Sequence, residues 1–212
     1  MAVDMITTNT TSFFREKQHF DYLSDVLLPK MLAERRTPLP RLKFWSAASS
    51  EGAEAFTLAM VLAEAQRHGK RFDWAILGTD LSSRMVAKAR KGIYNADQID
   101  QIAPELRQRY TMVSTAPEQA HLARIVPELR AKVQFKQMNL MAPSYPVDHG
   151  IDVIFLRNVL IYFRLEDRQK VVEHLMHHIR PGGYLFVGHS EGMSVQCAGL
   201  EQIKSTILRK TP

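Results

Sequence analysis

Short apolar runs alternate with longer segments of helical periodicity along most of this 212-residue chain. The apolar runs predict buried strands, which are residues 42–46, 74–79, 133–135, 151–156 and 184–187. The segments between them predict helices, which are residues 54–67, 83–91 and 165–180, the last ending before Pro181-Gly182-Gly183. Such an alternation favours a parallel sheet with helices on both faces. We therefore expect an α/β fold with a doubly wound, mostly parallel sheet.

Some segments lie outside this alternation. Residues 1–40 form a lead-in that contains a helical stretch at about 16–35, ending before Pro38 and Pro40. Residues 92–132 interrupt the α/β domain of residues 41–212, and a segment of this length is too long for a simple βα loop. It has a helix-like piece at 103–110 and β-like pieces at 110–113 and 122–126, which predict a small inserted β subdomain. Residues 200–210 could add a pair of edge strands.

Cysteine usage and hydropathy exclude several classes of protein. Cys197 is the single cysteine, so a disulfide framework and a multi-cysteine zinc site are ruled out. Apolar stretches such as residues 55–63 are too short to span a bilayer, and residues 1–15 lack the apolar core of a signal peptide. We therefore expect a cytoplasmic protein that is not inserted in a membrane.

The chain is basic, with a formal net charge of +6 and a pI of about 9.5. Such a balance indicates an acidic partner, which could be nucleic acid, anionic lipid or a carboxylate-rich protein. The densest basic patch consists of Arg84, Lys88, Arg90 and Lys91. Its helical spacing fits either a solvated helix face or a partner-binding face, and charge alone does not choose the partner.

Ligands of open α/β sheets bind outside the carboxyl ends of the strands. Asp80 ends the second predicted strand, where its carboxylate could accept both hydroxyls of a ribose or could cap the helix that starts at Ser83. The loop after the first strand lacks both the G-x-G-x-x-G pattern of dinucleotide sites and the G-K-[ST] of P-loops. This counts against NAD and ATP, but not against a nucleoside without phosphates such as S-adenosylmethionine (SAM).

Six ordered sequence blocks resemble those of the CheR family, the chemotaxis-receptor glutamate methyltransferases. They are residues 8–15 (Thr-Asn-Thr-Thr-Ser-Phe-Phe-Arg), 45–54, 79–81 with 89–94, 139–140, 157–163 and 188–191 (Gly-His-Ser-Glu). The blocks keep the family's order and cover nearly the whole chain. The resemblance implies the Rossmann-like fold of class I SAM-dependent methyltransferases, with SAM as cofactor and S-adenosylhomocysteine (SAH) as its product.

The resemblance also implies roles for individual residues. It places the ribose on Asp80, the amino group of the methionine moiety near Glu54, and the reacting methyl beside Arg15 and Tyr162, the expected catalytic residues. The full set expected to bind the cofactor is Asn9, Thr11, Arg15, Glu54, Asp80, Asn139, Leu140, Arg157 and Asn158. The resemblance implies no metal.

The implied reaction needs alignment more than acid–base catalysis. A sulfonium methyl is already activated, and a glutamate carboxylate with an ordinary pKa of about 4.3 is ionised at neutral pH. Orientation of reactants can lower a barrier by about 7–11 kcal/mol. Arg15 could hold the substrate carboxylate and Tyr162 could orient it. Since Arg15 follows two aromatic residues, we expect its side chain to be buried.

The implied partner is the cytoplasmic helices of a methyl-accepting chemotaxis receptor, whose glutamates would become methyl esters. Family members carry a helical domain before the Thr-Asn motif, where this chain has only residues 1–7. Some also grip a receptor tail peptide through a β edge with a glycine-containing turn, and residues 114–118 lack that glycine. The alternative function is a non-catalytic SAM- or SAH-binding or receptor-docking module. No aromatic-interleaved basic stripe supports a nucleic-acid methyltransferase, so nucleic acid is not an expected partner.

Several other side chains have simple structural interpretations. Phe13 and Phe14 are expected to pack in the core, and Tyr162 and Phe163 could simply begin a helix. His189 is expected to make structural hydrogen bonds in a strand-end loop. Histidines also recur at i, i+3 and i+4 spacing, namely His174, His177 and His178. Because no cysteine or carboxylate completes that set, we do not expect it to bind a metal.

Overall fold

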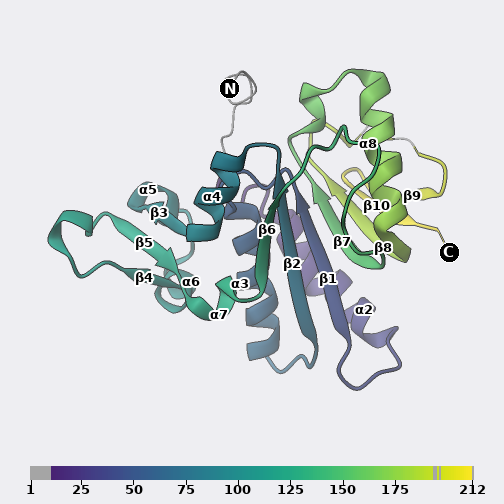
Figure 1. Cartoon of the computed structure of the whole chain (residues 1–212). Helices are drawn as coiled ribbons and strands as arrows, with labels where there is room; N and C mark the ends of the chain where they lie inside the picture. Colours follow the sequence, from purple (N-terminus) through teal and green to yellow (C-terminus); the bar gives the residue numbers. More distant parts are fainter. Residues whose placement is uncertain (1–10, 193–194, 196, 212) are drawn as a thin grey trace.

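The computed structural model describes residues 11–192, 195 and 197–211. Within these residues the main sheet has seven strands in the order β6-β2-β1-β7-β8-β10-β9 (Figure 1). The strands are β1 (Arg41–Ala47), β2 (Asp73–Asp80), β6 (Val133–Gln137), β7 (Ile151–Leu156), β8 (Ile179–Val187), β9 (Leu200–Lys204) and β10 (Ile207–Lys210). The first five are parallel, and β10 pairs antiparallel with β8 and β9. The predicted doubly wound, mostly parallel sheet and its terminal strand pair are confirmed.

Helices connect the parallel strands and cover the sheet. They are α3 (Ala53–Arg67) between β1 and β2, α4 (Ser83–Lys91) after β2, and α8 (Leu165–His178) between β7 and β8. Figure 1 shows α8 in front of the sheet and α3 behind it. In the described ranges, no helix is both long and apolar enough to cross a membrane.

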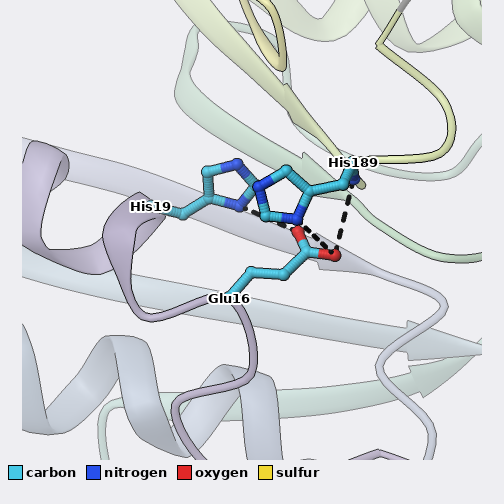
Figure 2. Close-up of side chains that lie close together, drawn as sticks. All are labelled: Glu16, His19 and His189. Atoms are coloured by element: carbon cyan, nitrogen blue, oxygen red, sulfur yellow. Dashed lines mark hydrogen bonds and ion pairs between the residues drawn. The ribbon is translucent and has the colours of Figure 1, made fainter.

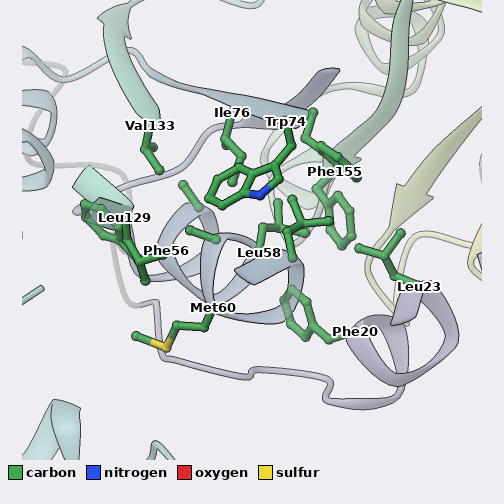
Figure 3. Close-up of a cluster of buried hydrophobic side chains, with 14 of the residues drawn as sticks. Phe20, Leu23, Phe56, Leu58, Met60, Trp74, Ile76, Leu129, Val133 and Phe155 are labelled. Carbon is green, nitrogen blue, oxygen red and sulfur yellow. The ribbon is translucent and has the colours of Figure 1, made fainter. Parts of the chain in front are cut away.

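Successive residues of the central strands enter two different cores. Phe44 and Phe155 join the cluster that contains the buried side of α3, part of which is drawn in Figure 3. Trp45 and Ile154, their immediate neighbours in sequence, join the cluster that contains the buried side of α8. All four side chains are almost fully buried. Strands buried on both faces have continuous apolar sequences, which is why these strands could be predicted.

The parallel strands end level with one another at one edge of the sheet. Ala47 of β1 pairs with Thr79 of β2 on one side and with Leu156 of β7 on the other, and Leu156 pairs with Val187 of β8. The chain adds β2 to one side of β1 and β7 to the other, so the strand order reverses between β1 and β7. The loops after β1, β2 and β7 therefore meet where a ligand site is expected in this fold class.

The segment before β1 is helical but irregular. The helix α1 (Gln18–Tyr22), the π-helical turn η2 (Leu23–Leu27) and the helix α2 (Leu28–Ala33) follow one another without a gap. Pro29, in the first turn of α2, has no N–H to donate to Asp25 four residues earlier, and the wider π-turn accommodates that missing bond. The prediction of a single helix over residues 16–35 is therefore right in position and wrong in regularity.

The boundary between α8 and β8 also differs from the prediction. The sequence predicts a helix to residue 180 and a strand from residue 184, but α8 ends at His178 and β8 begins at once with Ile179. Ile179 has an extended backbone and pairs with Ile151 of β7. Pro181 therefore lies inside the strand, beside a register shift, where a proline and glycines are tolerated.

A second sheet, which is antiparallel, is inserted between α4 and β6. Its strands in spatial order are β3 (Ile93–Asn95), β5 (Leu122–Ile125) and β4 (Thr111–Val113). The intervening helical segments are α5 (Ala96–Ile99), α6 (Pro104–Tyr110), η3 (Pro117–Gln119) and α7 (Pro127–Arg130). Figure 1 shows this sheet projecting from the side of the main sheet that carries β6. The predicted small β subdomain is confirmed.

Candidate active site

The side chain of Arg157, directly after β7, is the centre of a buried polar cluster at the carboxyl edge of the sheet. Its Nη1 donates to Glu54 Oε2 over 2.9 Å, and its Nη2 donates to Glu16 Oε2 over 3.1 Å. The same Nη2 donates to the backbone oxygen of Arg15. Only 2% of the Arg157 side chain is exposed. A buried cation is stable only when it is paired, so the guanidinium and its two carboxylates form one unit.

Glu54 reaches Arg157 from the first turn of α3. Its Oε1 accepts a hydrogen bond from Ser46 Oγ, at the end of β1, over 2.7 Å. Both carboxylate oxygens are therefore held, one by β1 and one by Arg157. A negative charge in the first turn of a helix also interacts favourably with the helix dipole. The Glu54 carboxylate is thus held between the ends of β1 and β7.

The loop between β1 and α3 turns sharply through residues with positive φ, namely Ala48 (63°), Ser50 (50°) and Gly52 (94°). A Cβ at Gly52 would lie 2.9 Å from Cζ of Phe135, so the position requires glycine. Ser49 Oγ is buried in this loop and has no hydrogen-bond partner among the described residues. The loop therefore brings small side chains to the strand ends and leaves a buried hydroxyl that a ligand could satisfy.

Asp80 ends β2 and is 8% exposed. Its Oδ2 accepts the N–H of Ser50 over 2.8 Å, and its Oδ1 accepts the N–H of Ser82 over 2.9 Å. The carboxylate thus joins the loop after β1 to the loop after β2. Ser82 is the residue that caps α4, since its hydroxyl accepts the N–H of Met85 over 3.3 Å. The alternative that Asp80 caps α4 is therefore wrong, and its role toward a ribose stays a prediction.

Glu16 extends the cluster toward the loop after β8, although no sequence motif singled it out. Its Oε1 accepts a hydrogen bond from Asn158 Nδ2 over 3.2 Å. Figure 2 shows the rings of His19 and His189 beside the same carboxylate, with their Nδ1 atoms 3.4 and 3.3 Å from its oxygens. Burial raises the pKa of Glu16, but Arg157 and the hydrogen bond from Asn158 outweigh burial, so the net pKa is lowered. Glu16 is therefore an anion at neutral pH, and His189 makes the structural contacts that the sequence predicts.

His19 is the buried member of this group. Its Nε2 lies 2.7 Å from Thr206 Oγ1, in the turn between β9 and β10. Burial, and after it the charge of Arg157, lower the pKa of His19 to about 4, in spite of the opposing effect of Glu16. His19 is therefore neutral at pH 7 and acts as a hydrogen-bonding side chain.

Glu16, His19 and His189 lie close enough to share a cation, since one potential ligand atom of each is within 4.8 Å of the others. Imidazole nitrogens and a carboxylate oxygen are ligands that zinc accepts. The Glu16 carboxylate is, however, already bonded to the guanidinium of Arg157 and to the amide of Asn158. A divalent cation would be repelled by that guanidinium. We therefore interpret the trio as a hydrogen-bond network around Glu16.

A second buried carboxylate, Glu191, fixes the turn that follows Arg157. Its Oε2 accepts the N–H groups of Asn158 and Gly188 over 2.8 and 2.7 Å, and its Oε1 accepts that of Leu160 over 2.7 Å. This holds Asn158 in a left-handed conformation, with φ of 57°. Glu191 belongs to the Gly-His-Ser-Glu block, but the sequence pattern does not reveal that its carboxylate binds the loop after β7.

The two side chains expected to be catalytic are both exposed. The sequence predicts a buried Arg15, and the structure contradicts this. Phe14 and Glu16 have left-handed φ values of 54° and 55° and reverse the chain on both sides of Arg15, so Phe13 and Glu16 are directed inward and the guanidinium outward. Tyr162 is 50% exposed and ends the 3₁₀ turn η4 (Leu160–Tyr162) rather than beginning an α-helix.

Of the four remaining predicted site residues, the structure describes three. Asn139, after β6, is exposed, and its Oδ1 accepts the N–H of Met141 over 2.9 Å. Leu140 is buried. Thr11 is partly buried near the start of the described chain, and Asn9 lies outside the described residues. Their roles toward a ligand stay predictions.

Phe13 and His178 have packing roles. Phe13 is buried and meets the ring of Tyr94 edge-on, with 4.8 Å between ring centroids, as predicted for a core residue. His178 is buried and stacks on His149, with 4.9 Å between centroids. Its Nδ1 lies 3.3 Å from the backbone oxygen of Asp148.

Comparison with known proteins agrees with these features. The family model described as CheR methyltransferase, SAM binding domain, matches residues 9–208. The chemotaxis protein methyltransferase of Escherichia coli K12 is 38% identical over 194 residues, which are 91% of this chain and 64% of that protein. Chemotaxis protein methyltransferase 2 of Pseudomonas aeruginosa is 37% identical over 193 residues, which are 90% of this chain and 66% of that protein. This chain therefore spans slightly less than two thirds of the length of these relatives.

Proposed function

The chain belongs to the CheR methyltransferase family, and we propose that it transfers the methyl group of SAM to glutamate side chains of chemotaxis receptors. The products would be glutamate methyl esters and SAH. The matched family model is a SAM-binding domain, and it covers residues 9–208. Relatives from two bacteria are named chemotaxis protein methyltransferases.

The strongest structural support is the placement of two carboxylates at neighbouring strand ends. Glu54 is held by Ser46 and Arg157 at the ends of β1 and β7. Asp80 is held by the loops after β1 and β2. Ionised carboxylates only accept hydrogen bonds, so this edge suits a ligand that brings hydroxyl donors and positive charge. SAM brings both, through its ribose and its ammonium and sulfonium groups.

The residues present fit SAM in kind. Asp80 would accept the ribose hydroxyls, and Glu54 would face the ammonium of the methionine moiety. The buried hydroxyl of Ser49, which has no partner within the described ranges, offers a further hydrogen bond. The other residues that we propose to line the site are Asn9, Thr11, Asn139, Leu140, Arg157 and Asn158.

Bound SAM supplies an already activated methyl group, so the chain has to orient the acceptor and exclude water. The Arg15 guanidinium would hold the acceptor carboxylate through a charge-assisted hydrogen bond, and the Tyr162 hydroxyl would orient the same group. Arg157 is bonded to two carboxylates and is committed to the scaffold. The acceptor glutamate needs no general base, since it is ionised at neutral pH.

We propose that the acceptors are cytoplasmic helices of a methyl-accepting receptor, so that the protein acts in the cytoplasm. The exposure of Arg15 and Tyr162 suits a large substrate that presents one side chain to the edge of the sheet. The net charge of +6 favours association with an acidic partner. A receptor tail peptide could pair with β4, which lies at an edge of the inserted sheet.

Transfer of labelled methyl from SAM to a purified receptor fragment tests this function. The cytoplasmic fragment of an Escherichia coli chemotaxis receptor is a suitable acceptor, because the methyltransferase of that bacterium is 38% identical to this chain. We expect base-labile label on glutamates and none on a fragment in which those glutamates are replaced by alanine. SAH binding without any transfer would contradict the proposal and favour the non-catalytic module.

A further inference from the structure

We propose that Glu16 is a positioning residue for methyl transfer. Its carboxylate anchors the lead-in segment to the loops after β7 and β8 and thereby sets the place of Arg15, the preceding residue. This inference rests on the proposed function, because it assumes that Arg15 contacts the acceptor carboxylate. Neither the sequence motifs nor the matched family description assigns Glu16 a role.

The anchoring contacts come from two loops that are far from Glu16 in sequence. Arg157 and Asn158, after β7, donate to its two oxygens over 3.1 and 3.2 Å. His189, after β8, places its backbone nitrogen 3.4 Å and its ring Nδ1 3.3 Å from Oε1. Gln18, two residues further along the same segment, contacts the His189 ring as well. Only 12% of the Glu16 side chain is exposed, so the carboxylate is enclosed by the groups that it holds.

Neutralising Arg157 does not by itself account for Glu16. Glu54 already pairs with the same guanidinium over 2.9 Å. Burying a second carboxylate beside one guanidinium has a desolvation cost, and the hydrogen bond from Asn158 helps Arg157 to offset it. What Glu16 adds is the connection between the lead-in segment and the Asn158 and His189 loops.

The backbone around Arg15 shows why this connection matters. Phe14 and Glu16 have φ values of 54° and 55°, and such conformations cost about 1–3 kcal/mol each and persist only where the surroundings hold them. On one side the N–H of Phe14 donates to Thr57 Oγ1 over 3.2 Å. On the other side the Glu16 side chain provides the hold. Arg157 also binds the backbone oxygen of Arg15 between them, so the direction of the Arg15 side chain depends on both anchors.

The variant Glu16→Gln tests the inference. Glutamine keeps the shape and one acceptor oxygen, but it removes the charge and sets an amide donor against Arg157, Asn158 or His189. Since Glu54 still holds Arg157, we expect SAH affinity to change less than about 3-fold. A misplacement of about 1 Å can cost 10²-fold in rate, so we expect kcat per SAH-binding site to fall about 10–100-fold, with a smaller change in KM for the receptor fragment. The control Glu128→Gln, on the exposed surface of α7, should behave as wild type.

Amide hydrogen exchange of the SAH complex provides a readout that needs no turnover. In Glu16→Gln, exchange over residues 12–20 should rise about 10-fold, while exchange in β1 and β2 should not change. Unchanged exchange over residues 12–20, or an equal loss of SAH-binding sites and turnover, would overturn the positioning role. If wild type transferred no methyl while the exchange changed as expected, the proposed function would fail and the anchoring by Glu16 would stand.

Discussion

At the scale of single residues, the carboxylates of Asp80 and Glu54 are held in different ways at the cofactor edge, which is the carboxyl edge of β1, β2 and β7. Asp80 is bonded to backbone N–H groups of Ser50 and Ser82, whereas Glu54 is bonded to the side chains of Ser46 and Arg157. Two backbone N–H groups fix the position of the Asp80 carboxylate. Such an anion is suited to neutral donors such as ribose hydroxyls, and Glu54 is suited to a charged group.

Replacing the carboxylate of Asp80 should therefore weaken cofactor binding. A hydrogen bond to a charged group contributes about 1.5–3 kcal/mol, so Asp80→Ala should weaken SAH binding about 10–100-fold in calorimetry. Asp73→Ala, at the other end of β2 where Asp73 pairs with Lys132 over 2.6 Å, is the control and should bind SAH as wild type does. Unchanged affinity in Asp80→Ala would contradict the ribose assignment.

The exposed guanidinium of Arg15 should matter for turnover and not for the cofactor. In Arg15→Ala, we expect SAH affinity within about 3-fold of wild type and a fall in kcat/KM of about 10–100-fold, since a charge-assisted bond to the acceptor is lost. Lys17→Ala removes another exposed cation nearby and should leave both quantities unchanged. An equal loss of binding and turnover in Arg15→Ala would make Arg15 a cofactor or folding residue.

The sequence predicted some residues of the site and missed others. Asp80 could be found because it ends a predicted strand, and Arg157 because it lies in a recognisable block. Glu16 could not be found, because its partner Arg157 is 141 positions away in the sequence. A single glutamate that belongs to no motif also gives no sign that its side chain is buried. The exposure of Arg15 was also predicted wrongly, because sequence does not show the left-handed backbone of Phe14 and Glu16.

At the scale of elements, the tight loop before α3 depends on one glycine. Gly52→Ala should destabilise the fold and weaken SAH binding, because a Cβ there would lie 2.9 Å from Phe135 Cζ and 3.0 Å from the Ala89 Cβ. Gly69→Ala is a matched control, since Gly69 has a similar φ of 88° and nothing within 4 Å of the added Cβ. Overpacking costs about 1–3 kcal/mol, so urea unfolding should show Gly52→Ala less stable than Gly69→Ala by about that amount. An equal loss of stability in the two variants would contradict the close contact between a Cβ at position 52 and Phe135.

The elements that are buried on both faces were predicted well, and so were the short strands β4 and β5, but two other short elements were missed. β7 is apolar throughout apart from Asp152, and its bounds were predicted fully. The three-residue strand β3 and the four-residue helix α7 have too few residues to show a period, and their pairing partners are distant. The end of α8 was misjudged because pairing of Ile179 with Ile151 overrides the helical pattern.

At the scale of the whole molecule, acid should destabilise the fold through His19. Its pKa is about 4 in the folded chain and 6.5 in the unfolded one, so the unfolded state binds more protons as the pH falls below 6.5. Between pH 7 and pH 5 this removes about 2 kcal/mol of stability. Glu16, whose pKa is lowered from 4.5, adds its own loss only at lower pH.

Urea unfolding at pH 7 and pH 5 tests the contribution of His19. In His19→Gln, the free energy of unfolding should fall less between these two values than in wild type, by about 2 kcal/mol. His177→Gln, on the exposed surface of α8, should keep the wild-type dependence. The same pH dependence in wild type and His19→Gln would contradict the shifted pKa of His19.

The most direct test of the whole molecule is a calorimetric titration of the folded chain with SAH, with NAD as the control ligand. The cofactor edge formed by β1, β2 and β7 predicts one SAH site per chain with micromolar affinity, no binding of NAD, and loss of affinity in Asp80→Ala. If the folded chain bound no SAH, or bound SAH equally well without the Asp80 carboxylate, the edge of the sheet would not be the cofactor site.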